Sequence, residues 1–427
     1  MKNKLLFCLL AVCSVFVSCD DKDDKYQDYV VATPLTMSLA EFKEDAIAVT
    51  DPVPIQVSGK IYAYGNYIFV NDVNRGFHVL DNTDATAPKN IAFIKLEGNY
   101  DISIKNNRLY ADSYGDLVVM NISDIENINL ITRLDNAIYD DYGYTSATYV
   151  DWPQADIYEY GAFDYATEAI IGWELRTEKR LISEYEKQFN DLAVNDTFSN
   201  GAESVATNGS TTGQGGSLAR FKIVDEYLYA IDYNSINIFD ISDLNDPQTL
   251  EKVWANGTIE TIFNQGDLLF LGGTQGMYIY DISSPATPSF VSEFRHGTAC
   301  DPVVVDGDYA YITLRGGTPC GGTESGLYVV DISNLENPEL KSFYALSEPY
   351  GLGVKDNTLF VCDGPEGLKV FDKERTPNLL QINHFKDINT YDVIPLQHSL
   401  LMIGDKVLNQ YEYTGNTIRL LSSYGLD

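Results

Sequence analysis

Positive charge is scarce in this 427-residue chain, which contains 29 Lys and Arg residues against 62 Asp and Glu residues, for a formal net charge of −33. An excess of negative charge repels the phosphates of nucleic acids and the headgroups of anionic lipids, so we expect neither as a partner. The same charge is compatible with neutral glycans, cations or basic proteins, and it favours solubility.

Catalytic motifs are also lacking. The four histidines, at positions 78, 296, 384 and 398, are scattered without metal-ligand spacing. The chain has no GxSxG nucleophile elbow, no P-loop and no GxGxxG between a strand and a helix. These absences argue against an enzyme of a familiar class and predict no organic cofactor.

Long apolar runs are confined to the N-terminus. Lys2 and Lys4 precede an apolar run over residues 5–17, the pattern of a secretory signal too short to span a bilayer as a helix. Because "FVSC" resembles a bacterial lipobox, we expect a lipoprotein signal peptide over residues 1–18 and acylation of Cys19 after cleavage. The alternative is an ordinary signal peptide that ends near a cysteine.

An acidic segment follows Cys19. Its "DDKDD" resembles the export tether of surface-exposed lipoproteins in Bacteroidetes-type bacteria, so we interpret residues 19–29 as an acidic tether. The resemblance implies an outer-membrane lipoprotein exposed at the cell surface, with the lipid as its membrane anchor. The alternatives are a solvated flexible linker and a periplasm-facing protein.

What the sequence has in abundance is one repeated phrase. Residues 276–294 read "GMYIYDISSPATPSFVSEF", and related stretches begin at Gly76, Asp116, Ser235, Gly326, Gly367 and Val407. Adjacent landmark residues, such as Asp81 and Asn121 or Asp331 and Asp372, are 40 or 41 residues apart. Strand-like repeats with a period near forty residues are typical of propeller blades.

Each repeat contains four strand-like runs, named a to d outward from the central axis. In "YIYDIS" the Asp and Ser can bond nearby backbone N–H groups and close the turn after strand c, while the Ile points back into the blade. Pro285 and Pro288 then fix backbone angles and withhold N–H donors, so the chain folds back as strand d.

The motifs "LYVVDIS", "LVVMNIS" and "YIYDIS" resemble the LVIVD repeat family of bacterial β-propeller proteins. The resemblance covers residues 59–427 apart from one insertion. It implies an all-β fold, a seven-bladed β-propeller of four-stranded antiparallel blades, and it says little about function because propellers host unrelated activities.

Two pieces lie outside the repeats. Residues 30–58 are expected to brace the first blade and to contain a short helix, for which Ser38 and Glu41 form a capping box. The insertion, residues 136–216, lies between blades 2 and 3 and is expected to rise from the top face, where strand d ends. A helix is expected within its residues 174–189, followed by a low-complexity linker.

The first half of the insertion is rich in Tyr and Asp and contains Tyr142, Tyr144 and Trp152. Aromatic rings stack on the flat faces of sugars, and carboxylates accept hydrogen bonds from sugar hydroxyls. These three residues are therefore candidate glycan-binding residues. The alternative is that they form a small core of the insertion.

Three cysteines remain after the signal peptide and the lipidation site. Cys300 lies in the connection into the fifth blade and Cys320 in the long b-to-c loop of that blade. These connections emerge on the same face of a propeller, so we expect a Cys300–Cys320 disulfide in an oxidising compartment. Cys362 is expected to be a buried strand residue.

Several carboxylates should gather at the top face, where strand b ends and strand a begins. Those at the b ends are Asp72, Asp112, Asp232, Asp363 and Asp405, and those at the a starts are Asp101, Glu260, Asp301 and Asp392. They could bind Ca²⁺ or include a catalytic acid for glycosidic chemistry. Their periodic recurrence favours a simpler role, capping the b-to-c loop.

The candidate ligand-binding residues at this rim are Asp112, Asp301, Arg315, Tyr350 and Asp363, and the alternative for Arg315 is an ion pair with Asp301. Three functions stay open. The first is a surface binding or scaffold module for a glycan or a protein. The second is a propeller glycosidase or lyase, and the third is a structural component of an outer-membrane assembly.

Overall fold

The computed structural model describes residues 26–45, 47–138, 153–164, 167–181, 212–297, 302–316, 322–414 and 417–426. Among these, residues 26–35, 153–163 and 172–181 belong to a smaller compact unit and the remainder to a larger one. No helix in these ranges is long and apolar enough to cross a membrane.

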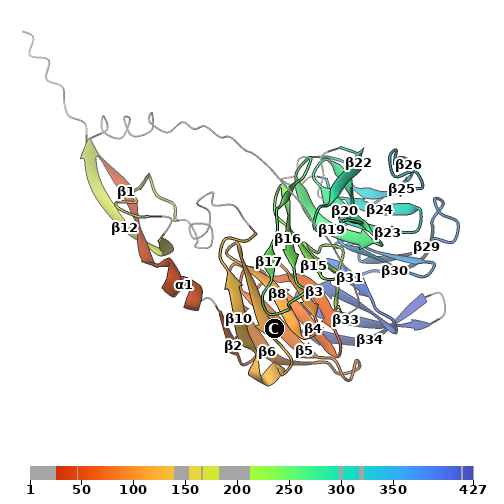
Figure 1. Ribbon diagram of the computed structural model, residues 1–427, viewed down its shortest axis with the longest axis horizontal. Coiled ribbons are helices and arrows are strands. Elements are labelled where there is room, and N and C mark those ends of the chain that lie inside the picture. The colour runs from red at the N-terminus through yellow and green to blue at the C-terminus, as the bar shows by residue number, and fades with distance from the viewer. Residues whose placement is uncertain are drawn as a thin grey trace, which may run out of the picture. The chain divides into compact units, whose positions relative to one another are not determined.

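The larger unit is built from antiparallel sheets of consecutive strands, so each sheet has a nearly uniform colour in Figure 1. The first sheet contains β3 (Ser58–Tyr64), β4 (Tyr67–Asp72), β5 (Gly76–Asp81) and β6 (Lys89–Leu96). The second contains β7 (Ile102–Lys105), β8 (Arg108–Ser113), β9 (Asp116–Asn121) and β10 (Asn129–Leu134), with the 3₁₀ turn η1 (Ile125–Asn127) before β10.

The third and fourth sheets follow the insertion. The third contains β14 (Phe221–Val224), β15 (Tyr227–Ile231), β16 (Ser235–Asp240) and the short edge strands β17 (Gln248–Thr249) and β18 (Val253–Trp254). The fourth contains β19 (Ile259–Gln265), β20 (Leu268–Gly273), β21 (Gly276–Asp281) and β22 (Ser289–Arg295).

Three further sheets complete the larger unit as described. The fifth contains β23 (Val303–Asp306), β24 (Tyr309–Leu314), β25 (Gly326–Asp331) and β26 (Glu339–Ala345). The sixth contains β27 (Leu352–Lys355), β28 (Thr358–Cys362), β29 (Leu368–Asp372) and β30 (Leu380–Phe385). The seventh contains β31 (Asp392–Pro395), β32 (Ser399–Gly404), β33 (Val407–Thr414) and β34 (Thr417–Gly425). The fold is therefore all-β and consistent with a propeller.

The turn after the third strand has a repeated geometry in the first six sheets. The landmark carboxylate or amide accepts a hydrogen bond from the N–H two residues later, as in Asp281 to Ser283 at 2.6 Å and Asp331 to Ser333 at 3.0 Å. In the second to fifth sheets the next residue is a buried isoleucine, and Ile282 is an example. The repeated phrase thus marks a turn that ends the strand, which is the architectural role expected for it.

The core lies between neighbouring sheets, because each sheet buries both faces. One cluster joins the first and second sheets through Phe77, Val79, Ile104 and Leu109. Another joins the seventh sheet to the first and brings Ile394, Leu401 and Ile403 against Ile61 and Ile68. Contacts between the first and last repeats are thus as apolar as those between consecutive ones.

Between Ser38 and β3 the chain forms a short helix and a short strand. Of the capping-box residues, Ser38 precedes α1 (Leu39–Asp45) and Glu41 lies in its first turn, where Ser38 Oγ accepts the Glu41 N–H at 3.2 Å. Next, β2 (Ile47–Thr50) pairs with the outer strand β6. Ile55 is then fully buried, and its N–H donates to Leu426 O at 2.9 Å, which ties this segment to the end of the chain.

A separate three-stranded sheet is formed by β11 (Ile157–Tyr158), β1 (Tyr26–Ser38) and β12 (Glu168–Leu181), in that order. The segment expected to be tether and brace therefore contributes a strand next to insertion strands. Tyr29, Val31 and Ile157 form a small buried cluster.

The helix expected within residues 174–189 is wrong for residues 174–181, which belong to β12. Arg176 and Arg180 both contact Glu159 and Glu178 through ion pairs. Residues two apart share one face of a strand, so this spacing satisfies the charges in a strand. Pairing with β1 outweighs the helix preference of Glu, Leu, Arg and Lys.

A candidate binding pocket at the mouth of the inner cavity

An inner cavity of about 190 Å³ is lined by the innermost strands of all seven sheets. Its lining includes Tyr62 of β3, Ser103 of β7, Ile223 of β14, Phe263 of β19, Val304 of β23, Gly353 of β27 and Pro395 of β31. Residues 212–217 also line it, and we call them the channel segment. The end of the insertion therefore occupies the space between the innermost strands.

The channel segment is held by backbone and side-chain bonds. The Gly213 N–H donates to Ile104 O at 2.9 Å, and β13 (Gln214–Gly215) pairs with β3. Ser217 Oγ then accepts the Leu352 N–H at 2.8 Å. The segment thus crosslinks the first, second and sixth sheets across the cavity.

The direction of this segment differs from the expectation that the insertion only rises from the top face. Thr212 bridges to Lys105, at the far end of β7, whereas Ser217 lies at the beginning of β27. Strand β10 ends at Leu134, which pairs with Leu117 near the opposite end of its sheet. The chain therefore leaves at one end of the sheets and returns through the cavity from the other.

A cluster of buried charges lies where the channel segment ends, and we call Lys60, Asp101, Asp112 and Asp392 the buried charge cluster. Lys60 Nζ is 3.3 Å from Asp101 Oδ2. Asp101 also accepts the backbone N–H groups of Arg220 and Phe221, the latter at 3.1 Å. The start of the third sheet is thereby bonded to the residue that enters the second sheet.

Burial shifts the pKa of three members of the buried charge cluster. It lowers the pKa of Lys60, raises that of Asp112 to about 6 and raises that of Asp392 to about 7. Asp112 accepts the Tyr100 and Asp101 N–H groups, which offset part of its shift. Asp392 Oδ2 has no hydrogen-bond partner within the described residues. These carboxyls are therefore protonated more readily than exposed ones.

Above this cluster lies a pocket of about 530 Å³, which we call the mouth pocket. Its lining comprises Gln56, Val57, Ser58, Gly59, Lys60, Asn71, Val73, Tyr100, Leu218, Arg315, Tyr350, Tyr391, Asp405 and Lys406. These residues come from the loops that enter the innermost strands and from the ends of the second strands. Its volume lies in the roughly 300–1,000 Å³ range of small-molecule sites.

Aromatic rings and cations are paired within the mouth pocket. The Arg315 guanidinium lies 4.0 Å from the Tyr350 ring centroid, well within cation–π range. Tyr350 and Tyr391 meet edge to face with centroids 5.2 Å apart. The Tyr391 hydroxyl donates to Asp405, and that of Tyr350 donates to Glu348 at 2.9 Å. These bonds fix both rings in place.

The aspartates at the ends of the second strands have a repeated structural role. Asp72, Asp112 and Asp363 each accept two successive backbone N–H groups from the loop that enters the innermost strand of the same sheet. Asp232 instead accepts the Asn234 and Ser235 N–H groups. The expected b-to-c cap is therefore correct for Asp232 and wrong for the other three, which fasten the entry loop instead.

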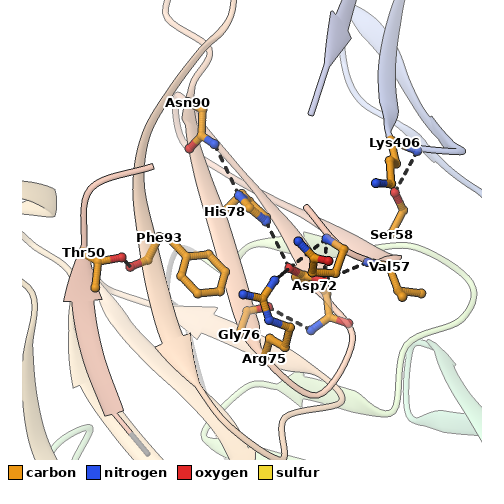
Figure 2. Close-up of polar contacts among 12 residues, drawn as sticks. Thr50, Val57, Ser58, Asp72, Arg75, Gly76, His78, Asn90, Phe93 and Lys406 are labelled. Atoms are coloured by element: carbon orange, nitrogen blue, oxygen red, sulfur yellow. Dashed lines mark hydrogen bonds and ion pairs between the residues drawn. The ribbon is translucent and has the colours of Figure 1, made fainter. Parts of the chain in front are cut away.

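Figure 2 shows this arrangement around Asp72. Its carboxylate accepts the Val57 N–H at 2.9 Å and pairs with Arg75, while His78 Nε2 lies 3.7 Å away. Burial would raise the pKa of Asp72, but the neighbouring His78 and the hydrogen bonds from the Val57 and Gln56 N–H groups outweigh it and lower that pKa. Asp72 is therefore a charged anchor of the entry loop.

The structure brings together two of the candidate ligand-binding residues, Arg315 and Tyr350, in the mouth pocket. Asp112 is buried below, and Asp363 is buried in an ion pair with Lys369. Asp301, Tyr142, Tyr144, Trp152, Cys19 and the Cys300–Cys320 pair lie outside the described residues.

Sequence reasoning missed Lys60, Tyr100, Tyr391 and Lys406. Tyr100 and Tyr391 each come just before an innermost strand, a signal that could have placed them at the mouth. Among the described residues no group of three or more His, Cys, Asp or Glu side chains is arranged to hold a metal ion.

Comparison with known proteins agrees with the repeat assignment. Residues 57–91 and 296–345 match the LVIVD repeat, so the chain carries LVIVD repeats, as the motifs predict. A search of curated protein sequences finds no match.

Solved structures with some similarity include the computationally designed Ika8 protein, with 10% identity over 88% of this chain and 90% of that chain and a TM-score of 0.48. Kluyveromyces lactis Hsv2 has 10% identity over 87% and 100% of the two chains and a TM-score of 0.46. Apo AztD from Citrobacter koseri has 12% identity over 50% and 62%, with a TM-score of 0.37. Such similarities carry no information on ligand or activity.

Proposed function

We propose that this chain is a seven-bladed propeller that acts as a binding module and takes a glycan into the mouth pocket. The observation that carries the proposal is the pairing of Tyr350 with Arg315 and Tyr391 in a pocket of suitable volume. Fixed aromatic rings beside hydrogen-bonding side chains are suited to sugars, whose faces are apolar and whose edges carry hydroxyls.

Two observations support a closed ring of seven blades. The inner cavity is lined by residues from seven innermost strands, and the seventh sheet shares an apolar cluster with the first. In a closed ring, a ligand can bind either at an end of the inner cavity or on the outer surface of the blades. Because the channel segment occupies part of the space between the innermost strands and leaves a cavity of only about 190 Å³, we assign recognition to the larger mouth pocket.

The proposal is tested with a glycan array on the soluble form that lacks residues 1–25. Tyr350→Ala should abolish binding because it removes the ring beneath Arg315. The matched control is Tyr233→Ala, which removes a tyrosine that is 69% exposed and lies outside the mouth pocket. Equal binding by both variants, or no binding by the parent protein, contradicts the proposal.

The proposed location is the outer membrane, at the cell surface, through a lipid on Cys19. The supporting features are the apolar run over residues 5–17 after Lys2 and Lys4, the resemblance of "FVSC" to a lipobox and the acidic "DDKDD" after Cys19. A Cys19→Ala variant should leave the membrane fraction, and protease added to whole cells should digest the parent protein. Membrane retention of the variant would refute the anchor, and protease resistance would favour a periplasm-facing protein.

One observation favours a hydrolase as a second candidate function. Burial raises the pKa of both Asp112 and Asp392, and glycosidic chemistry needs a carboxyl whose raised pKa keeps it protonated as the general acid, beside an ionised partner. Neither residue lines the mouth pocket, so substrate would have to displace the residues above them. Hydrolysis of a bound oligosaccharide that is lost in Asp112→Asn would establish this alternative.

A further inference from the structure

We infer that Lys222 is a reactive amine in the inner cavity, where it condenses with small aldehydes or ketones to form an imine. Lys222 does not line the mouth pocket, so this site is independent of the proposed binding of a glycan there. Three features assign it, namely the position of Lys222 on its strand, the lack of a polar partner for its amine and the size of the cavity.

Lys222 occupies a position that lines the inner cavity in most of the sheets. In six sheets, the residue two positions before the end of the innermost strand lines the cavity and pairs with an aromatic residue of the second strand. These six residues are Tyr62, Ser103, Lys222, Phe263, Val304 and Gly353. Lys222 is the one charged residue among the six.

The alternation of side chains along β14 directs Lys222 toward the fourth sheet. Phe221 and Ile223 belong to an apolar cluster shared with the second sheet, whereas Val224 packs against the cluster shared with the fourth. Residues two apart lie on the same face of a strand, so Lys222 shares the face of Val224. Its Nζ accordingly lies 5.6 Å from the ring centroid of Phe263 in β19.

Burial lowers the pKa of three lysines among the described residues, and two of them have polar partners. Lys60 is 3.3 Å from Asp101, and Lys105 donates to the backbone carbonyl of Asp225. Lys222 has no hydrogen-bond or ion-pair partner in the described part of the chain, and burial is the only cause of its lowered pKa. An aromatic ring stabilises an ammonium less than a paired carboxylate does, so the neutral amine is favoured relative to an exposed lysine.

The inner cavity limits what can reach Lys222. Its volume of about 190 Å³ is below the roughly 300–1,000 Å³ of most small-molecule sites, so a ligand must be small. The lining residues Thr212, Gln214 and Asp306 are exposed, so the cavity opens to solvent where the innermost strands end. Asp306 is the one carboxylate among the described lining residues, and it is paired with Lys373. A lining with one lysine and one carboxylate favours an uncharged ligand.

A neutral lysine amine is a nucleophile toward carbonyl compounds. Its lone pair attacks the carbonyl carbon and forms a C–N bond, while the π electrons of the C=O bond move to oxygen. Oxygen gains a proton and nitrogen loses one, which gives a carbinolamine. Nitrogen then forms the C=N bond as the C–O bond breaks, and the hydroxyl leaves as water with the remaining N–H proton. One carbonyl compound is consumed and one water is released, without an oxidant or a reductant.

The test treats the soluble form that lacks residues 1–25 with a limiting amount of propanal at neutral pH. Sodium cyanoborohydride is added because it reduces an imine to a stable secondary amine, and mass spectrometry of peptides gives the propylated fraction of each lysine. Lys222 should be modified several-fold more than the exposed Lys89, and more than Lys60 or Lys105. As pH is raised, its rate should reach a plateau at a lower pH than the rate of Lys89.

Two variants and one larger aldehyde locate the reaction. Lys222→Arg should lose the main adduct, because a guanidinium stays protonated, whereas the matched control Lys89→Arg should keep it. Thermal unfolding of both variants shows whether each is folded. Pyrene carboxaldehyde should label Lys89 and spare Lys222, because its fused rings exceed the cavity.

Two results would overturn the reactive amine. Equal modification of Lys222 and Lys89 by propanal would mean that Lys222 behaves as an ordinary surface lysine. Equal modification of both residues by pyrene carboxaldehyde would mean that Lys222 does not lie within the cavity. Glycan binding at the mouth pocket is measured separately with Tyr350→Ala, so each site can fail without the other.

Discussion

The buried carboxyl of Asp392 should make the protein less stable as pH rises, and Asp392→Asn should remove that effect. Asp392 is fully buried, its Oδ1 accepts the Val393 N–H at 2.9 Å, and its Oδ2 has no hydrogen-bond partner among the described residues. Replacing it with Asn keeps the shape and the acceptor for Val393 and removes the ionisation.

The magnitude follows from the shift of its pKa. The folded-state pKa of about 7 compares with an ordinary value of 3.8, and the first cause is burial. Between these two values the unfolded chain binds fewer protons at this site, so stability decreases as pH increases. The difference corresponds to about 4 kcal/mol, at about 1.4 kcal/mol for each pKa unit. The loss is complete above about pH 7 and absent below about pH 4.

Urea unfolding at about pH 5 and about pH 8, followed by intrinsic fluorescence, measures this effect. The variant should lose less stability between the two pH values than the parent protein. Asp356→Asn is the matched control, because the Asp356 side chain is 85% exposed and the substitution removes the same charge from the surface. If Asp392→Asn and Asp356→Asn change the pH dependence equally, a buried ionisable carboxyl is not the cause.

Two other predictions concern the channel segment and the cysteines. Gly216→Ala should destabilise the protein by about 1–3 kcal/mol through overpacking, because its Cβ atom would lie 2.5 Å from Cγ of the buried Asp392. Thermal unfolding measures this loss. The control is Gly425→Ala, which has open space around the added Cβ atom and should change stability little. Unchanged stability of Gly216→Ala would mean that the segment is not seated in the cavity. If Cys300 and Cys320 form a disulfide, the soluble form should show one thiol, Cys362, when titrated unfolded without reductant, and three thiols would refute the pairing.

The blades could be predicted because their signals are local. Each strand is a short β-branched and aromatic run, and the turn after it is closed by a carboxylate that bonds an N–H two residues away, as in Asp281 and Ser283. Such geometry repeats wherever the local sequence repeats. The same local signals explain why Arg315 and Tyr350 could be predicted to lie together at the mouth, because both lie next to the top ends of strands.

The rest of the mouth pocket depends on contacts between distant residues. Lys60 and Lys406 belong to the first and last sheets, and they meet at one pocket because those two sheets pack against each other. Asp112 gave a clear periodic signal, but its partners are the N–H groups of Tyr100 and Asp101 rather than a ligand. The periodic spacing therefore singled out Asp112, which has a structural role, but it could not show which loop Asp112 binds.

The channel segment links these observations. Gly216 allows the chain to pass beside Asp392, where any larger residue would collide with the carboxyl group. Ser217 then bonds to Leu352, and the Arg220 and Phe221 N–H groups bond to Asp101 at the floor of the mouth. The segment occupies part of the space between the innermost strands and lines the cavity of about 190 Å³ that remains there. These bonds therefore anchor the chain between the insertion and the third sheet next to the buried charge cluster.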